Sequence, residues 1–155
     1  MIRPLPWIDL SPYWPELEAI AEGRDGPKRD FDSSEYWTDD SHLKGVCGEK
    51  IHSLVTGRPM DDVARINGDG GSDFPNGIDI KTATVWQDPW LKHPVAATKW
   101  PRRFVLVALD FDNKRGRSMG WATAEDMKKA PARSWREKGP LQHSLRWTDL
   151  RQLGK

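Results

Sequence analysis

Cysteine and long apolar runs are almost absent from this sequence. Its only cysteine is Cys47, so no disulfide can form within the chain, and the composition suits a reducing compartment. No apolar run approaches the roughly 18 residues that a membrane-spanning helix needs, and no basic-then-apolar signal precedes the first elements. We therefore expect a cytoplasmic protein without a membrane partner.

Patterns for several kinds of site are also missing. The four histidines, His42, His52, His93 and His143, lack the spacing of a zinc site and have no Cys-x-x-Cys partner. Nothing local supports Ser-His-Asp chemistry, and nothing indicates an organic cofactor. Cys47 falls in an apolar stripe, which favours a core position over a nucleophile. His52 is expected at the surface.

Large aromatic side chains and charge of both signs are abundant. Nine Trp and four Phe among 155 residues supply enough apolar surface for one folded domain. Residues 1–80 carry eight Lys/Arg and sixteen Asp/Glu (net −8), whereas residues 81–155 carry sixteen and seven (net +9). A basic half beside an acidic half suits a polyanion-binding surface next to a cation-binding site, although uneven solvated charge gives the same count.

Helical and strand-like segments alternate along the chain. The strongest strand is 104–109, whose continuous apolar run predicts cover on both faces of a sheet. The strongest helix runs from about residue 42 to 56, and Gly45 and Gly48 within it predict a close backbone contact. A capping box of Thr123 and Asp126 predicts a helix through residue 129. Further candidates are a helix at 11–21, strands at 63–66, 78–85 and 119–122, and a long irregular stretch at 86–103. The order predicts an α/β or α+β fold.

The residues around a Pro75-Asn76-Gly77 turn carry the most chemistry. A three-residue hairpin turn pairs Phe74 with Ile78, and so brings Asp73 opposite Asp79 on one face. A two-residue turn would instead send the two aspartates to opposite faces. Lys81 lies two residues beyond Asp79, on the same face of the strand.

Two carboxylates on one face repel each other unless a cation lies between them. Oxygen ligands of this kind suit Mg²⁺ or Mn²⁺, which can activate a water and accept phosphate oxygens. Lys81 would then stabilise the transition state, and Glu49 on the preceding helix would supply a further carboxylate. The alternate-residue spacing from Asn67 to Asp73 also resembles a Ca²⁺ loop, but the twelfth position falls on Ile78, which cannot ligate.

The string Asp73, five residues, then Asp79-Ile80-Lys81 resembles the active-site motif of the PD-(D/E)XK nuclease superfamily. The Gly48-Glu49 pair is similar to the first acidic position of that family, and Gly71-Ser72 stands where the motif's proline would be. The resemblance covers about residues 43–129. It implies a three-layer αβα core with a mixed, roughly four-stranded sheet flanked by helices. It also implies Asp73, Asp79 and Glu49 as metal ligands, with Lys81 as the catalytic lysine.

We accordingly expect one nuclease-like domain over residues 1–155, with an N-terminal extension at 1–41, a catalytic core at 42–129 and a C-terminal segment at 130–155. The expected activity is Mg²⁺-dependent hydrolysis of DNA, in a phage or mobile-element enzyme or one of repair or restriction, in a bacterial or phage-infected cell. A homodimer would let two sites cut both strands. The alternative is a non-catalytic module on the same fold that binds nucleic acid or protein.

Basic residues interleaved with tryptophans predict where DNA would bind. Trp86, Trp90 and Trp100 lie among the cations of residues 86–103, and each ring either stacks on bases or packs on the core. A basic turn follows at about residues 114–117, whereas residues 134–138 are expected to be a solvated face. The candidate DNA-binding residues are Lys92, Lys99, Arg102, Arg103, Lys114 and Arg115.

Overall fold

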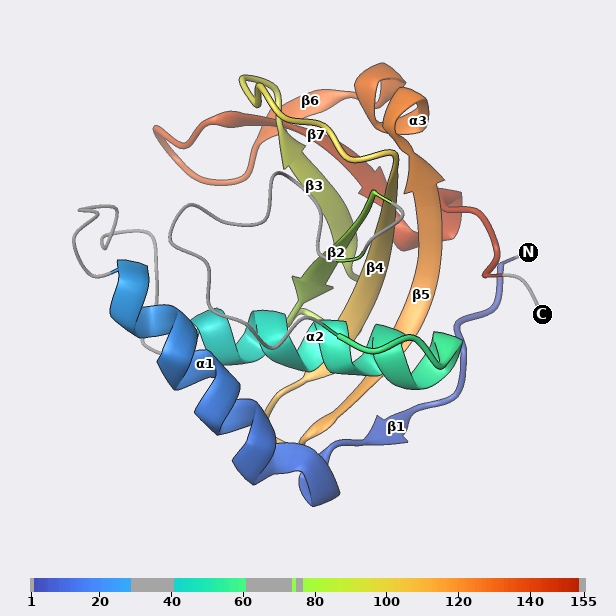
Figure 1. Ribbon diagram of the computed structural model, residues 1–155. Helices are drawn as coiled ribbons and strands as arrows, with labels where there is room; N and C mark the ends of the chain where they lie inside the picture. Colours follow the sequence, from blue (N-terminus) through green and yellow to red (C-terminus); the bar gives the residue numbers. More distant parts are fainter. Residues whose placement is uncertain (1, 29–40, 61–73, 75–76, 154–155) are drawn as a thin grey trace.

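The protein is an α+β fold built on a mixed four-stranded sheet. The computed structural model describes residues 2–28, 41–60, 74 and 77–153. Figure 1 shows the arrangement of the chain. The four-stranded sheet has the order β1-β5-β4-β2, and a three-stranded sheet has the order β3-β7-β6. The elements are β1 (Ile8–Asp9), η1 (Ser11–Tyr13), α1 (Trp14–Lys28), α2 (Ser41–Thr56), β2 (Ile78–Ala83), β3 (Trp90–Pro94), β4 (Arg103–Asp110), β5 (Arg115–Thr123), α3 (Ala124–Lys129), β6 (Ala132–Ser134), β7 (Leu141–Arg146) and η3 (Trp147–Asp149).

Strand β4 is the centre of the fold. It pairs parallel to β2 and antiparallel to β5, and its residues from Phe104 to Asp110 are all buried. Val105, Val107 and Leu109 join one hydrophobic cluster, while Phe104, Leu106 and Ala108 join another. The continuous apolar run therefore has cover on both faces, as the sequence predicts.

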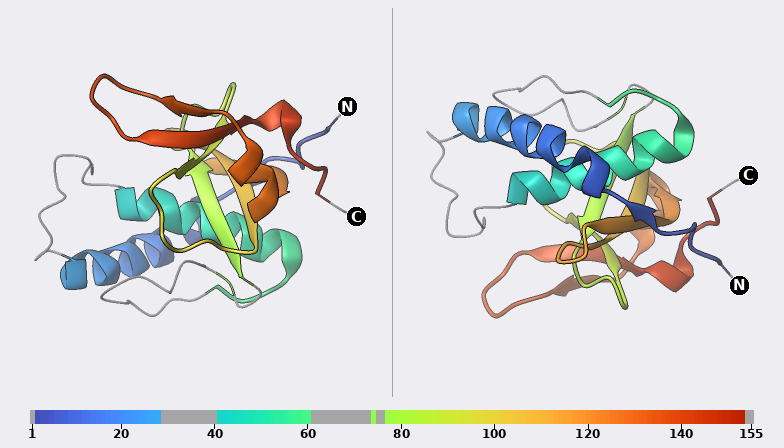
Figure 2. Two further views of the ribbon diagram at one scale, coloured as in Figure 1. Left: turned by 90° about the horizontal axis from the view of Figure 1, so that it is seen from above. Right: turned by 90° about the horizontal axis from the view of Figure 1, so that it is seen from below.

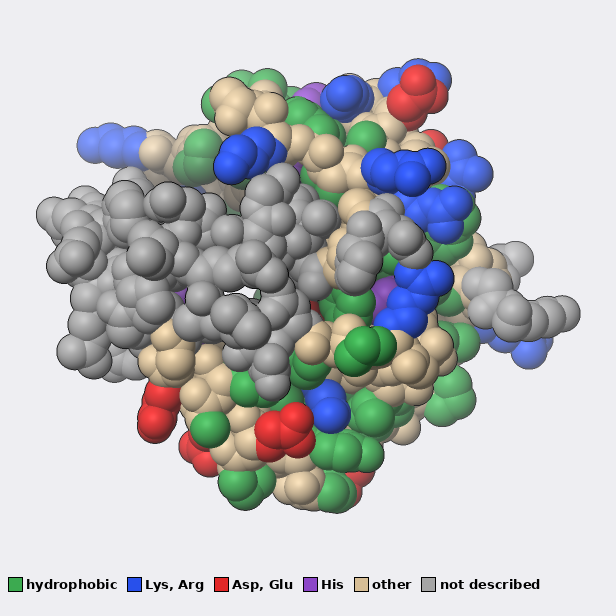
Figure 3. Space-filling model, viewed as in Figure 1, with side chains coloured by type: hydrophobic (Ala, Val, Ile, Leu, Met, Phe, Trp, Pro, Cys, Tyr) green, Lys and Arg blue, Asp and Glu red, His purple; other side chains and the backbone are tan. Residues whose placement is uncertain are grey.

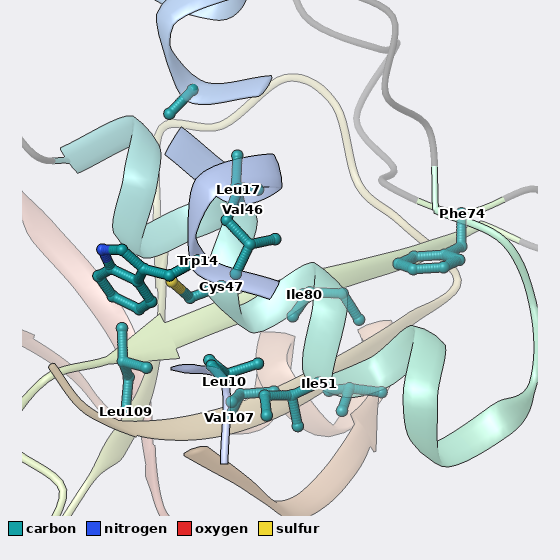
Figure 4. Packing of buried hydrophobic residues seen from close by; sticks show 12 residues of the cluster. Leu10, Trp14, Leu17, Val46, Cys47, Ile51, Phe74, Ile80, Val107 and Leu109 are labelled. Atoms are coloured by element: carbon teal, nitrogen blue, oxygen red, sulfur yellow. The ribbon is translucent and has the colours of Figure 1, made fainter. Parts of the chain in front are cut away.

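Helices α1 and α2 cover the first face. Val46, Cys47 and Ile51 of α2 pack against Ile80 and Val107 of the sheet (Figure 4). Helix α1 packs on α2 through Leu17, which is fully buried. Figure 2 shows both helices on one side of the four-stranded sheet. The N-terminal residues also extend the sheet itself, because β1 pairs with β5.

The three-stranded sheet and helix α3 cover the second face. Leu91 of β3 and Met127 of α3 are fully buried there, against Phe104 and Leu106. Both halves of the predicted Thr123–Asp126 capping box are present at α3. The predicted four-stranded mixed sheet with flanking helices is confirmed, and a second sheet adds to it.

Two expectations of secondary structure are wrong. Residues 86–103 are not irregular throughout, because β3 lies within them and pairs with β7. The prolines mislead here: Pro94 is the last residue of β3, where a missing N–H costs little. The first helix does not end near residue 21, because α1 continues to Lys28. The predicted strand at 63–66 lies outside the described residues.

No helix in the described parts of the chain is long and apolar enough to cross a membrane.

Candidate active site

The predicted three-residue turn is present before β2. Phe74 and Ile78 form an antiparallel bridge, in which the Phe74 N–H donates to the Ile78 carbonyl at 3.1 Å. The Gly77 N–H donates to the Phe74 carbonyl at 3.2 Å, and Gly77 has a φ of 72°, which favours glycine. Asp73 lies outside the described residues, so its predicted position opposite Asp79 stays a prediction, as does the alternative Ca²⁺ loop that ends on it.

A second contact fixes this turn to the start of β4. The Gly77 carbonyl accepts hydrogen bonds from the N–H groups of Arg102 (2.8 Å) and Arg103 (3.1 Å). The Arg102 side chain lies over Gly77 so closely that a Cβ there would stand 3.0 Å from Arg102 Cγ. Backbone hydrogen bonds thus hold the turn both internally and to the start of β4. They also place Arg102 and Arg103 directly beside it.

Asp79 and Lys81 point to the second face of the sheet. Asp79 lies beside Phe104 and Lys81 beside Leu106 in the parallel register, and residues side by side in a sheet share a face. Asp79 Oδ2 and Lys81 Nζ are 2.8 Å apart. The Asp79 side chain is 14% exposed and that of Lys81 34%, so a small ligand could reach both. The predicted position of Lys81 on the same face as Asp79 is confirmed.

Glu49 lies on the helix that covers the first face. Gly48 approaches β2 so closely that a Cβ on it would overlap Thr82 Oγ1, and Thr82 lies beside Val107 on that face. Glu49 is 5% exposed. The structure therefore brings Asp79 and Lys81 into contact on the second face of the sheet. It places Glu49 on α2, which covers the first face.

His93 is a neighbour of this pair that the sequence did not single out. Its ring packs against Phe104 (4.9 Å between centroids) and Trp100 (4.4 Å), on the face to which Asp79 points. Burial, and then the Lys81 cation, lower the pKa of His93, while Asp79 opposes that shift. The Lys99 backbone lies close to the ring and opposes the shift as well. No local sequence signal marks it, because only the packing of β3 against Phe104 brings the ring here.

His52 is buried, not at the surface as expected. Its ring packs edge-on against Phe74 with 4.8 Å between centroids, and burial, followed by the Arg58 cation, lowers the pKa of His52 to about 4. Cys47 is a core residue, as predicted, and burial raises the pKa of its thiol to about 12. Neither group has the properties of a nucleophile or general base at neutral pH.

The donor chemistry of Asp79 suits a hard cation. Asp79 offers carboxylate oxygens on a fixed strand, and the cationic Lys81 beside it suits phosphate. Within the parts of the chain that the structure describes, no three His, Cys, Asp or Glu side chains come together as metal ligands. The other predicted aspartate ligand, Asp73, lies outside the described residues.

The predicted DNA-binding residues separate into three places. Lys99, Arg102 and Arg103 lie around the start of β4, and Arg103 stacks on Trp121 at 4.7 Å. Figure 3 shows Lys and Arg side chains gathered on this face, where β4 begins and β5 ends. Two more candidates lie at the opposite end of β4, where Lys114 is in the turn and Arg115 is paired with Asp110 at 3.0 Å. Lys92 lies on the three-stranded sheet.

Of the tryptophans, Trp86 and Trp100 pack on the second hydrophobic cluster. Trp90 lies on β3 and contacts Trp135 instead. Residues 134–138 are exposed as expected, except that Trp135 is half-buried. The core-packing alternative therefore holds for two of the three rings in residues 86–103.

No protein-family description, no curated protein and no solved structure matches this chain.

Proposed function

We propose that the protein is a Mg²⁺-dependent deoxyribonuclease whose active site is centred on Asp79 and Lys81. The observation that carries the proposal is the ion pair between these side chains, on one face of a strand that directly follows the three-residue turn. A carboxylate and a lysine two residues apart place a ligand for a cation beside a hydrogen-bond donor for a phosphate oxygen.

Each residue has a defined part in this proposal. Asp79 and Asp73 would hold the metal ion. Glu49 is left out of the metal shell, because its helix covers the face of the sheet opposite to Asp79 and Lys81. The ion, when bound, lowers the pKa of a water and offsets charge on the phosphate. Lys81 donates hydrogen bonds to a phosphate oxygen or to the attacking water. Arg102, fixed beside the turn, contacts the flanking phosphates.

A wider setting belongs to the same proposal. The enzyme would act in the cytoplasm of a bacterial or phage-infected cell, in phage biology, repair or restriction. A homodimer would place one site on each strand of a duplex.

A second candidate function is a non-catalytic module that binds nucleic acid or protein. The favouring observation is that Lys81 already neutralises Asp79, while no three-ligand metal group occurs among the described residues. Such a module would bind DNA without needing a metal.

A cleavage assay separates the two candidates. Plasmid and linear DNA are incubated with the protein and Mg²⁺, Mn²⁺ or chelator, beside Asp79→Asn and Lys81→Ala. The controls are Asp112→Asn in an exposed turn and Lys129→Ala at the end of α3, which remove the same charges elsewhere. We expect metal-dependent cleavage that both site variants lose and both controls keep. DNA binding without cleavage by the wild type would select the module instead.

A further inference from the structure

The outer face of the three-stranded sheet carries two tryptophans and two cations in contact. Side chains alternate along β3, so that Leu91 and His93 are buried against the core while Trp90 and Lys92 project from the other face. Trp135, which follows β6, lies on that outer face: its Nε1–H donates to Ser144 Oγ at 2.8 Å, and Ser144 is the register partner of Lys92.

Trp135 orders the two cations. Lys92 Nζ lies 3.8 Å from the centre of the Trp135 ring, and the Arg133 guanidinium lies 4.4 Å from it. Trp90 packs edge-on against Trp135, with 5.2 Å between ring centroids, and Arg133 is 5.2 Å from the Trp90 ring. Cation–π contacts of this kind restrict long side chains that would otherwise move freely in solvent. We call Trp90, Lys92, Arg133 and Trp135 the outer tryptophan face.

The charge on this face is not balanced locally. Burial, and then the neighbouring Arg133 cation, lower the pKa of Lys92. Neither Lys92 nor Arg133 forms an ion pair with a carboxylate of the described residues, in contrast to Arg146 nearby, which pairs with Asp88 at 2.8 Å. Two cations that repel each other and have no local counter-charge favour an anionic partner.

The position of the face suits a long polyanion. Strand β3, which carries Lys92, contacts β2, which carries Asp79 and Lys81. Lys92 and Arg133 cover the Trp135 ring, which leaves little of it free to stack on a base. The face therefore offers positive charge to a nucleic-acid backbone. A partner that runs along the protein with evenly spaced charges would therefore be recognised through its backbone.

We propose that the outer tryptophan face binds the phosphate backbone of DNA through Lys92 and Arg133, which Trp135 holds in place. The inference rests on the proposed function, because it extends the path of the DNA from the nuclease site onto the second sheet. Contacts of this kind add affinity without base preference.

Binding is measured in chelator, so that cleavage plays no part. Fluorescence anisotropy follows a labelled duplex and a single strand of the same length over a series of salt concentrations. The variants are Lys92→Met, which keeps the hydrocarbon stem, and Arg133→Gln; Arg3→Ala near the N-terminus is the charge-matched control. We expect each face variant to weaken binding several-fold. The slope of log affinity against log salt is negative, and its magnitude should decrease by about 1 on the duplex and by about 0.7 on the single strand.

Further arms keep the proposal open to refutation. Arg133 is exposed, so Arg133→Glu preserves the fold even if Lys92→Met does not, and it should weaken binding further. Unchanged affinity and salt slope in Arg133→Glu would overturn the proposal. Binding to phosphatidylglycerol vesicles that depends on Lys92 and Arg133, with DNA binding unchanged, would overturn it as well.

The outcome is separable from that of the nuclease proposal. A wild type that cuts DNA, with face variants that bind as tightly as it does, refutes only the outer tryptophan face. If the wild type never cuts DNA and the face variants bind DNA more weakly than it does, only the nuclease proposal is refuted.

Discussion

Gly48 marks the closest approach of helix α2 to the sheet. Any side chain at that position would overlap Thr82 Oγ1, a buried oxygen with no hydrogen-bond partner among the described residues. The Gly48→Ala substitution should therefore destabilise the protein by about 1–3 kcal/mol through overpacking, although alanine favours helix. The measurement is the free energy of unfolding in urea.

Gly45, one turn earlier in the same helix, provides the matched control. Apart from its two neighbours and the backbone of its own helix, no atom of the described residues lies within 4 Å of a Cβ built there. Gly45→Ala should stabilise the protein by up to about 1 kcal/mol. Equal effects of the two substitutions would contradict the close contact at Gly48.

Asp126 couples the start of helix α3 to the C-terminal segment. Hydrogen bonds from Arg151, at 2.8 and 3.1 Å, and from Thr123 lower the pKa of Asp126 to about 2. A carboxylate with a lowered pKa stabilises the fold above its ordinary value of 3.8, and that contribution is lost as the pH falls towards 2.

Asp126→Asn should therefore cost about 1 kcal/mol or less above pH 4, because the ion pair is partly exposed. The difference from wild type should shrink steadily between pH 4 and pH 2. Urea unfolding at several pH values measures it, and a difference independent of pH would show that the charge of Asp126 plays no part.

At the scale of elements, secondary structure was predictable from the sequence where a few adjacent residues determine it. The apolar run of β4, the capping box of α3 and the glycine-ended turn before β2 each depend on a few adjacent residues, and each was predictable. The second sheet was not, because β3 and β6 are short and gain stability only by pairing with β7.

The candidate site divides in the same way. Asp79 and Lys81 were predictable, since strand geometry alone puts them on one face. His93 was not, because only the tertiary packing of β3 against Phe104 brings it near them. The burial of His52 depends on Phe74, which reaches α2 from beyond the turn.

Helix α2 should contribute a pH dependence through His52. The folded protein holds this ring neutral, with a pKa of about 4 against an ordinary value of 6.5. Its contribution to stability is therefore complete above pH 6.5 and is lost as the pH falls towards 4, by an amount on the order of 3 kcal/mol.

His52→Phe keeps an aromatic ring against Phe74 without a titrating group. Its unfolding free energy should fall less than that of wild type between pH 6.5 and pH 4. Parallel curves for the two proteins would mean that His52 is protonated in the fold at little cost.

At the scale of the whole molecule, the two halves of the chain contribute to different layers, although α1 and α2 together carry five acidic and four basic residues and are nearly neutral. Helices α1 and α2 come from the acidic half of the chain, whereas the three-stranded sheet and α3 come entirely from the basic half.

Metal binding should stabilise the whole molecule if the proposed site exists. An ion that binds only the folded chain raises its stability by about 2.7 kcal/mol at a hundred times its dissociation constant. We expect Mg²⁺ to raise the thermal midpoint of the wild type and of Asp112→Asn, but not that of Asp79→Asn. A rise in Asp79→Asn equal to that of wild type would place the metal elsewhere.

The double hydrogen bond at the Gly77 carbonyl also orders events during synthesis. Its two donors, Arg102 and Arg103, are translated well after the turn they hold, and β2 finds its parallel partner only once β4 has emerged. A nascent chain that ends before these arginines has Asp79 and Lys81 but neither the clamp nor the neighbouring strand. The turn and the strand that carries Asp79 and Lys81 can therefore reach their final positions only after β4 has been synthesised.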